Sequence, residues 1–236
     1  MISVVIPAYN EERKIAGSVK TIASFFADME IEIIVVDDGS RDHTIERLNE
    51  TGIASLRVVT NPANRGKGYS MKRGVMESRG EYILLTDTDL STPIAEFDKL
   101  FPCLSEFDVA IGSRGMKESS VKNALHRTWL GTLANRLFIK LLLPGIRDSQ
   151  CGFKLFRGEA AHRIFSRQTL SGFGYDFEIL FIARVNGYRI REVGVTWNHS
   201  DESKVRFYHY FATLLEFGRV VLNHLQKKYN GIRPAA

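Results

Sequence analysis

Residues 2–12 read Ile-Ser-Val-Val-Ile-Pro-Ala-Tyr-Asn-Glu-Glu, a short apolar segment that runs directly into a polar turn. Its first five residues form a continuous apolar run, which is typical of a strand buried on both faces of a sheet. After the turn, Ile15, Val19, Ile22 and Phe26 follow at the spacing of an amphipathic helix. A buried strand followed by an amphipathic helix indicates the first unit of an α/β domain.

The same alternation continues through the first half of the chain. Further buried strands are predicted over residues 32–36, 56–59, 82–86 and 109–113. Helices are expected between these strands, and capping and turn residues mark their ends. The second helix is expected to start at Ser40 or Asp42 and to end at Gly52. The third is expected to follow Gly68, and the fourth to start at Ser91, Thr92 and Pro93. The pattern predicts a mostly parallel sheet flanked by helices, with right-handed crossovers.

The second half of the chain is less regular. Helices are predicted over 122–143, 176–186 and 207–228, with a strand over 153–156 and a second strand through Val193, Val195 and Trp197 that buries one face. No internal repeat or low-complexity linker divides the sequence. We therefore expect one domain over residues 1–236, composed of a nucleotide-binding half (1–113) and an added basic half (114–236).

Composition and charge limit the class of protein. The 236 residues are 44% hydrophobic and 25% charged, which excludes a disordered, collagen-like or coiled-coil chain. Cys103 and Cys151 cannot form a disulfide framework, which favours a reducing compartment. The chain starts directly with a predicted strand and contains no apolar run of about 18 residues, so we expect neither a signal peptide nor a membrane span.

The two halves carry opposite charge. Residues 1–113 contain 12 Lys and Arg against 18 Asp and Glu, whereas residues 114–236 contain 20 against 9. A strongly basic half suggests that this part of the protein meets an anion, such as a phosphate, an acidic membrane surface or a nucleic acid. A solvated basic surface without a partner is the alternative.

Polar residues follow four of the predicted strands, at the sheet edge where open α/β folds bind ligands: Pro7 to Glu11, Asp37 to Ser40, Asp87 to Asp89, and Ser113 with Arg114. Asp87 and Asp89 are two carboxylates one residue apart, and hard oxygen ligands of this kind suit Mg²⁺ or Mn²⁺. Lys67 lies in a glycine-rich segment before a helix, which suits contact with a phosphate. The segment does not have P-loop spacing, and no GxGxxG motif follows the first strand, which argues against a dinucleotide-binding enzyme.

Eight motifs occur in a characteristic order: SVVIPAYNEE, VVDDGSRD, NRGKG, Asp87-Thr88-Asp89, IGSRG, DSQCGFKLF, YDFE and Glu202-Ser203-Lys204. Together they resemble the inverting family 2 glycosyltransferases of the GT-A fold. Within that family the similarity is greatest to the polyprenyl-phosphate hexosyltransferases, including the dolichyl-phosphate β-glucosyltransferases. The resemblance extends from residue 2 to about residue 206.

The resemblance implies a role for each matching position. The residues expected to contact the nucleotide-sugar donor are Pro7, Tyr9, Glu11, Val36, Asp38, Lys67, Asp87, Thr88, Asp89 and Arg114. Asp87 and Asp89 are expected to bind Mg²⁺ or Mn²⁺ at the donor diphosphate, and Arg114 and Lys204 to contact the acceptor phosphate. Asp89, Arg114 and Lys204 are the expected catalytic residues. Asp176 is a possible general base, and so is Glu178, although both also suit the N-terminus of a helix.

The implied reaction is metal-dependent transfer of a hexose, with inversion, to a dolichyl or undecaprenyl phosphate. Ser91 and Asn198 stand where related mannosyl enzymes have Gln and Arg, which favours glucose from UDP-glucose over mannose from GDP-mannose. A lipid phosphate is already anionic, so its transfer reaction needs no strong general base. The alternatives are the GDP-mannose enzyme, transfer to a hydroxyl acceptor, and a nucleic-acid-binding protein. Acidic strand ends and the lack of a recognisable motif argue against nucleic acid as a partner.

Two predicted helices suit contact with a membrane surface. Helices 122–143 and 207–228 combine wide apolar faces with basic residues, among them Lys227 and Lys228, as interfacial helices do. A packed core helix or a dimer contact would show the same pattern. We expect a peripheral protein on the cytoplasmic face of a membrane, and the sequence leaves its oligomeric state open.

Overall fold

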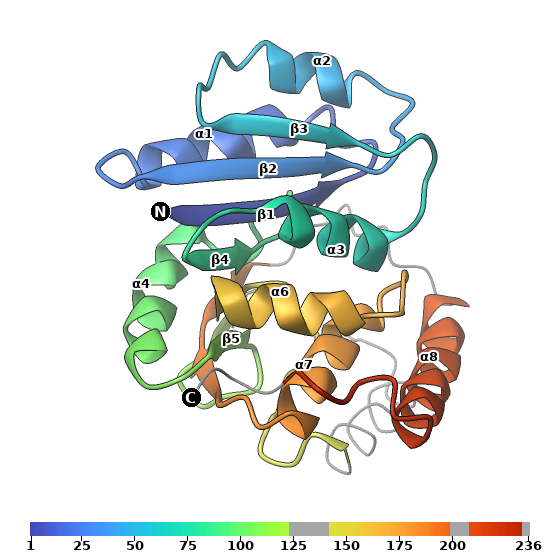
Figure 1. Cartoon of the computed structure of the whole chain (residues 1–236). Coiled ribbons are helices and arrows are strands. Elements are labelled where there is room, and N and C mark those ends of the chain that lie inside the picture. Colours follow the sequence, from blue (N-terminus) through green and yellow to red (C-terminus); the bar gives the residue numbers. More distant parts are fainter. Residues whose placement is uncertain (123–141, 199–207, 233–236) are drawn as a thin grey trace.

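A seven-stranded sheet forms the centre of the computed structural model, which describes residues 1–122, 142–198 and 208–232 (Figure 1). The strand order is β3-β2-β1-β4-β7-β5-β8, and β7 alone among these strands runs antiparallel to its neighbours. The strands are β1 (Ile2–Ala8), β2 (Ile31–Asp37), β3 (Leu56–Thr60), β4 (Tyr82–Leu85), β5 (Val109–Ser113), β7 (Lys154–Arg157) and β8 (Ile190–Gly194). A separate parallel pair joins β6 (Ser120–Lys122) to β9 (Thr196–Asn198).

Helices cover both faces of the sheet, as the continuous apolar strands require. The helices are α1 (Ile15–Phe25), α2 (Thr44–Asn49), α3 (Lys67–Glu77), α4 (Phe97–Leu100), α6 (Gly158–Arg167), α7 (Tyr175–Val185) and α8 (Tyr208–Leu225), with 3₁₀ turns at Ile94–Glu96 and Phe101–Ser105. Alternate strand residues enter different cores: Val5 packs with residues of α3, α6 and α7, whereas Val4 and Ile6 pack with α1 and α4. Figure 1 shows α3 and α6 side by side on one face.

The register of the strands brings the predicted polar turns together. Pro7 of β1 pairs with Val36, and Ala8 with Asp37, so the ends of β1 and β2 lie level. Asp37 in turn pairs with Thr60 of β3. Because β7 is antiparallel, it begins where its neighbours end, and its first residue Lys154 lies beside Leu85 and Ile111. The sheet edge therefore collects side chains from both halves of the chain.

The structure confirms the predicted strands and helices of the first half, and it corrects three details of the predicted elements, two of them in the second half. The strand predicted through Val193 and Trp197 is two strands, because Val195 leaves the sheet after β8: its N–H donates to Ser113, and its carbonyl accepts from Ser120 of β6. The fourth helical segment begins at Ile94, after Pro93, without a side-chain cap. Lys122, the first residue of the helix predicted over 122–143, belongs to β6, and residues 123–141 lie outside the described part of the chain.

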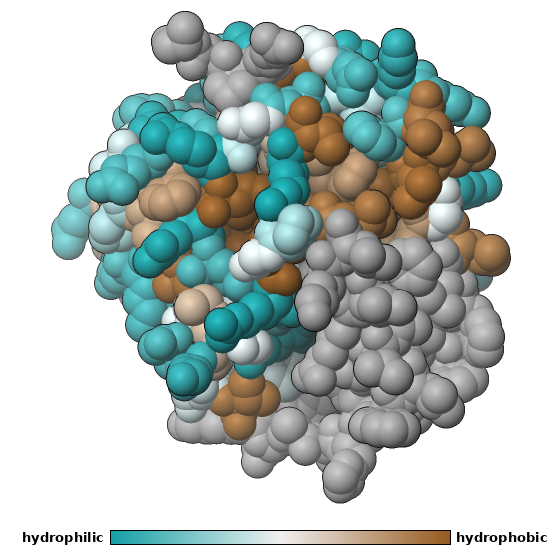
Figure 2. Space-filling model, turned by 90° about the horizontal axis from the view of Figure 1, so that it is seen from below, coloured by the Kyte–Doolittle hydropathy of each residue, from teal (hydrophilic) through white to brown (hydrophobic). Residues whose placement is uncertain are grey.

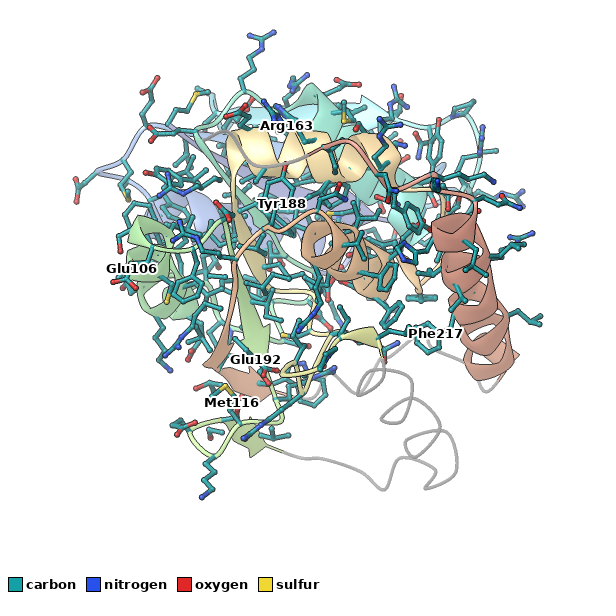
Figure 3. All side chains as sticks on the ribbon, turned by 60° about the horizontal axis from the view of Figure 1, so that its bottom comes forward. Glu106, Met116, Arg163, Tyr188, Glu192 and Phe217 are labelled. Atoms are coloured by element: carbon teal, nitrogen blue, oxygen red, sulfur yellow. The ribbon has the colours of Figure 1, made fainter. Side chains whose placement is uncertain are left out.

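Helix α8 packs against α7 through aromatic contacts. The rings of Phe217 and Phe177 have centroids 4.5 Å apart, and Figure 3 shows Phe217 on the inner side of α8. After α8, Tyr229 returns to the core, and its hydroxyl donates to Glu178 over 2.6 Å. The chain that follows α8 is therefore fixed to the first turn of α7.

Candidate functional site

A cavity of about 390 Å³ opens at the ends of β1, β2 and β3. It is lined by Tyr9, Asp37, Gly39, Ser40, Arg41, Ile45, Thr60, Asn61, Pro62, Ala63 and Asn64. The Asp37 carboxylate is 1% exposed; its Oδ2 accepts the N–H of Ser40, and its Oδ1 has no hydrogen-bond partner among the described residues. A buried acceptor without a partner in a cavity wall is costly unless a ligand donates to it.

Asp38 shapes the loop before α3 rather than the cavity wall. Its carboxylate accepts from the Asn61 side-chain amide over 2.7 Å and from the N–H groups of Arg65 and Gly66 over 3.0 and 2.8 Å. Gly66 has a φ of +98°, and a Cβ there would lie 2.4 Å from the carbonyl oxygen of Ser171, so only glycine fits. The predicted contact between Asp38 and the donor base stays a prediction.

The turn after β1 is fastened to the turn after β2. Asn10 adopts a φ of 54°, and its N–H donates to the Ser40 hydroxyl over 2.9 Å. The N–H of Glu11 donates to Thr44 Oγ1 over 2.8 Å, at the start of α2. These contacts hold Tyr9, which lines the cavity, and the half-buried Glu11 at the same edge. Five of the predicted donor contacts (Pro7, Tyr9, Glu11, Val36 and Asp38) thus lie on neighbouring segments.

Asp87 and Asp89 flank a tight turn at the end of β4. The N–H of Leu90 donates to the carbonyl of Asp87 over 3.3 Å, and Leu90 has a φ of 45°, a strained value for a leucine. Thr88, between the two acids, is buried, and its carbonyl accepts from Ser18. Asp89 is exposed, and its Oδ1 accepts from the N–H of Ser91 over 2.9 Å. The strained turn presents two carboxylates at the sheet edge.

Lys67, the first residue of α3, contacts the first of these carboxylates. Its Nζ lies 2.6 Å from Asp87 Oδ1. Burial alone would raise the pKa of Asp87, but the charges of Lys67, Lys154 and Arg114 outweigh it and lower the pKa. Burial would likewise lower the pKa of Lys67, but Asp87, Asp176 and Asp89 raise it. Both side chains are therefore charged over the physiological range.

Lys154 and Asp176 form a buried ion pair behind this turn. Their side chains are 0% and 5% exposed, and Lys154 Nζ also donates to the carbonyl of Cys151. Asp176 comes from the first turn of α7, as predicted. Glu178, two residues further along α7, is directed elsewhere: it accepts from Thr169, Leu170 and Tyr229 and holds the loop before α7.

Arg114, after β5, binds Asp148 through two parallel hydrogen bonds. Nε donates to Oδ2 over 2.7 Å and Nη2 to Oδ1 over 2.9 Å. Burial would lower the pKa of Arg114, but the hydrogen bond and charge of Asp148 raise it. The guanidinium also lies 5.5 Å from the centre of the Trp197 ring. Lys204, the second predicted contact of the acceptor phosphate, lies outside the described residues.

The carboxylates of Asp87 and Asp89 have the oxygen chemistry that Mg²⁺ and Mn²⁺ prefer. Within the described part of the chain, no group of three or more His, Cys, Asp or Glu side chains is placed to hold a metal ion. A cation held here would therefore complete its coordination with oxygens of a ligand, as Mg²⁺ does with substrate phosphates.

Three polar residues at this edge were assigned no role from the sequence. Asp37 stands beside the predicted Asp38, and only the pairing of the strands tells which carboxylate faces the cavity. Lys154 is the one charged residue in the apolar segment 153–156. A lysine at a buried strand position is almost always paired, so the sequence could have indicated a buried partner for it. Asp148 opens the motif DSQCGFKLF, but no local pattern indicates its pairing with Arg114.

Solved structures with the same architecture define the class of the fold. Glucosyl-3-phosphoglycerate synthase from Mycobacterium tuberculosis, solved with Mn²⁺, UDP and phosphoglyceric acid, matches with a TM-score of 0.69 at 20% identity, over 100% of this chain and 80% of that one. Mannosyl-3-phosphoglycerate synthase from Rubrobacter xylanophilus matches with a TM-score of 0.72 at 17% identity, over 97% and 74%. The mostly parallel sheet and its flanking helices are those of the GT-A glycosyltransferases.

Comparison with known sequences identifies the family to which the chain belongs. The model of glycosyl transferase family 2 matches residues 3–165. The dolichyl-phosphate beta-glucosyltransferase of Homo sapiens is 36% identical over 224 residues, which cover 86% of this chain and 69% of the human protein. That of Saccharomyces cerevisiae is 32% identical over 232 residues, covering 86% and 69%. The chain belongs to glycosyltransferase family 2 and is a glycosyltransferase. In the described ranges, every helix is too short or too polar to cross a bilayer.

Proposed function

We propose that this protein transfers glucose from UDP-glucose to dolichyl phosphate or a related polyprenyl phosphate, with inversion and with a divalent metal. The observation that carries the proposal is one sheet edge that joins the cavity beside Asp37 to the Asp87–Asp89 turn. A nucleoside fits a cavity with an unpartnered carboxylate oxygen, and a diphosphate fits the charged turn beside it. The names of the relatives supply the sugar and the lipid.

In this mechanism Asp87 and Asp89 would hold Mg²⁺ or Mn²⁺, which supplies charge neutralisation for the departing diphosphate. Lys67 adds a second positive charge at the same turn. Arg114 is held rigidly by Asp148, so its remaining donors are oriented before a phosphate arrives. The protein thus acts mainly by bringing two anions into line, and Lys204 is the further residue that we assign to the acceptor phosphate.

The state of Asp176 supports a phosphate acceptor over a hydroxyl acceptor. A hydroxyl group must lose a proton during transfer and needs a free carboxylate as base. Asp176 is buried and its carboxylate is ion-paired with Lys154, so it is not free to contact an acceptor hydroxyl. An acceptor phosphate attacks with an oxygen that is already anionic, so the ion pair does not hinder it.

A matrix of donors and acceptors tests the function. UDP-glucose and GDP-mannose are each supplied with dolichyl phosphate, undecaprenyl phosphate or a lipid alcohol, with Mn²⁺ or with EDTA. We expect glucosyl transfer from UDP-glucose to the lipid phosphates, lost in EDTA. Transfer from GDP-mannose would establish the mannosyl alternative, and transfer to the alcohol alone would overturn the phosphate acceptor.

The nucleotide cavity is tested by UDP titration calorimetry. Asp37→Ala removes the unpartnered acceptor and is expected to weaken UDP binding by roughly tenfold to a hundredfold, the value of a hydrogen bond to a charged group. Asp38→Ala is expected to weaken UDP as well, and also to lower the melting temperature because three donors lose their acceptor. Unchanged UDP affinity in both variants would place the nucleotide elsewhere.

The outer face of α8 supports a peripheral position on a membrane. Leu215, Leu222 and Leu225, here called the leucine face, are 75%, 52% and 72% exposed. Arg219 lies between them on the same helix, and Lys227 and Lys228 follow it, all exposed. Figure 2 shows hydrophobic side chains gathered at the right of the molecule, where α8 lies. Exposed leucines among basic residues suit an anionic lipid surface, and we propose the cytoplasmic leaflet.

Sedimentation with vesicles tests the leucine face. Leu222→Asp combined with Leu225→Asp is expected to weaken binding to vesicles containing phosphatidylserine by tenfold or more, because two exposed leucines that would enter the lipid surface are exchanged for charges that anionic lipids repel. Met76→Asp on α3 is the matched control, since Met76 is also 46% exposed but lies away from α8. Equal vesicle binding by the wild type and the double variant would exclude this face.

A further inference from the structure

Two groups of the protein itself lie against the Asp87 carboxylate, whose side chain is 37% exposed. Its Oδ1 contacts the ammonium of Lys67 at 2.6 Å. Its Oδ2 lies against the backbone of Gly152, where even a Cβ would approach within 2.4 Å. Lys67 therefore already holds the oxygen through which a cation would bind Asp87. Asp89 differs, because it is exposed and has no ion pair in the described part of the chain.

The backbone that carries Lys67 is fixed, whereas its side chain can swing. Asp38 accepts the N–H of Gly66, and the carbonyl of Ser171 accepts the N–H of Gly68 over 2.8 Å, one residue on either side. A lysine side chain has four rotatable carbons, and this one is 22% exposed. Its ammonium can thus leave Asp87 and reach toward solvent without movement of α3.

Lys67 and a divalent cation compete for Asp87. Two positive charges on one carboxylate oxygen repel strongly at such short range. Only a new anionic partner, with room beside the same turn, makes its departure favourable. A nucleoside diphosphate is such an anion.

We propose that Lys67 is a tethered counter-ion that competes with the metal for Asp87 and moves to the donor diphosphate, so that metal and nucleotide bind cooperatively. The proposal rests on the donor and metal site assigned above. Without nucleotide, Lys67 keeps the affinity of Asp87 for a divalent cation low. With nucleotide bound, the Lys67 ammonium contacts the diphosphate and no longer opposes binding of the metal to Asp87. Linkage then requires that the metal raise UDP affinity by the same factor.

Electron paramagnetic resonance of free Mn²⁺ measures metal binding without any turnover. In the absence of UDP, Lys67→Met is expected to bind Mn²⁺ about tenfold or more tightly than wild type, since a charge-assisted contact no longer competes. Lys67→Gln, which keeps a hydrogen-bond donor but no charge, is expected to do the same. With UDP present, we expect the Lys67 variants to bind Mn²⁺ no more tightly than wild type, or less tightly. Lys99→Met is the matched control, because Lys99 also lies 2.6 Å from a carboxylate, that of Glu96, away from the turn.

A double variant separates competition at Asp87 from a general change in charge. Asp87→Asn is expected to abolish the gain in Mn²⁺ affinity that Lys67→Met produces, because the contested oxygen has lost its charge. A gain equal to that of Lys99→Met, or one that persists with Asp87→Asn, would overturn the proposal. Wild type that binds Mn²⁺ with UDP while Lys67→Met shows no gain would refute this inference alone. Wild type that binds no Mn²⁺ even with UDP would refute the assigned metal site.

Discussion

Asp89→Asn is expected to reduce glucosyl transfer by about 100-fold or more, equivalent to about 2.7 kcal/mol of barrier. The amide keeps the shape of the side chain but supplies no charge to a cation at the leaving diphosphate, where charge develops during transfer. The measurement is turnover of UDP-glucose at saturating Mn²⁺ and lipid phosphate. Because Asp89 is exposed and belongs to a turn, the melting temperature is expected to stay close to that of wild type.

Asp98→Asn is a suitable control, because Asp98 is exposed in α4, away from the turn. It removes the same charge and should leave turnover unchanged. If Asp89→Asn retained near-wild-type turnover without divalent ions, the metal assignment of the Asp87–Asp89 turn would be wrong.

Lys154→Met is expected to lower the free energy of unfolding by about 3–5 kcal/mol, the largest stability effect that we predict. The change leaves Asp176 buried in the core without its partner, and a lone buried carboxylate is costly. Urea denaturation at neutral pH measures the loss. The double variant Lys154→Met with Asp176→Leu removes both charges and is expected to recover most of the stability.

The control for this prediction is an ion pair at the surface. Arg47 of α2 and Glu50, just after that helix, lie 3.0 Å apart with both side chains more than half exposed, so Arg47→Met should cost about 0.5 kcal/mol or less. If Lys154→Met were as mild as Arg47→Met, the buried pair would not be the structural element that its burial indicates. If the double variant were no more stable than Lys154→Met, the loss would come from packing and not from charge.

Much of the first half could be predicted from the sequence because the signals there are local. Residues 2–6 and 109–113 are mainly apolar segments, and each forms a strand buried on both faces. The same reasoning located Asp87 and Asp89 at the end of β4, since polar residues that end a buried strand must lie at the sheet edge. The GT-A fold followed from the order of the motifs, a specific pattern even though each member is weak.

What could not be predicted depends on pairing between distant segments. Nothing in residues 153–156 shows that this strand inserts between β4 and β5 in the antiparallel direction. For the same reason the segment through Val195 was predicted as one strand, although it forms β8, which pairs with β5, and β9, which pairs with β6. The Arg114–Asp148 and Lys67–Asp87 contacts likewise join segments that only the folded chain brings together.

The position of β7 has a consequence for how the chain is made. A ribosome that has released residues 1–113 has produced β1 to β5, yet β5 has no neighbour in the sheet, because β4 and β5 are separated by β7 and β8 comes later still. About forty more residues must be synthesised before β5 can pair with β7. Contacts of such long sequence separation are slow to form, and the waiting strand is an exposed apolar edge. The division by charge at residue 113 is therefore not a boundary at which nascent chain can finish folding.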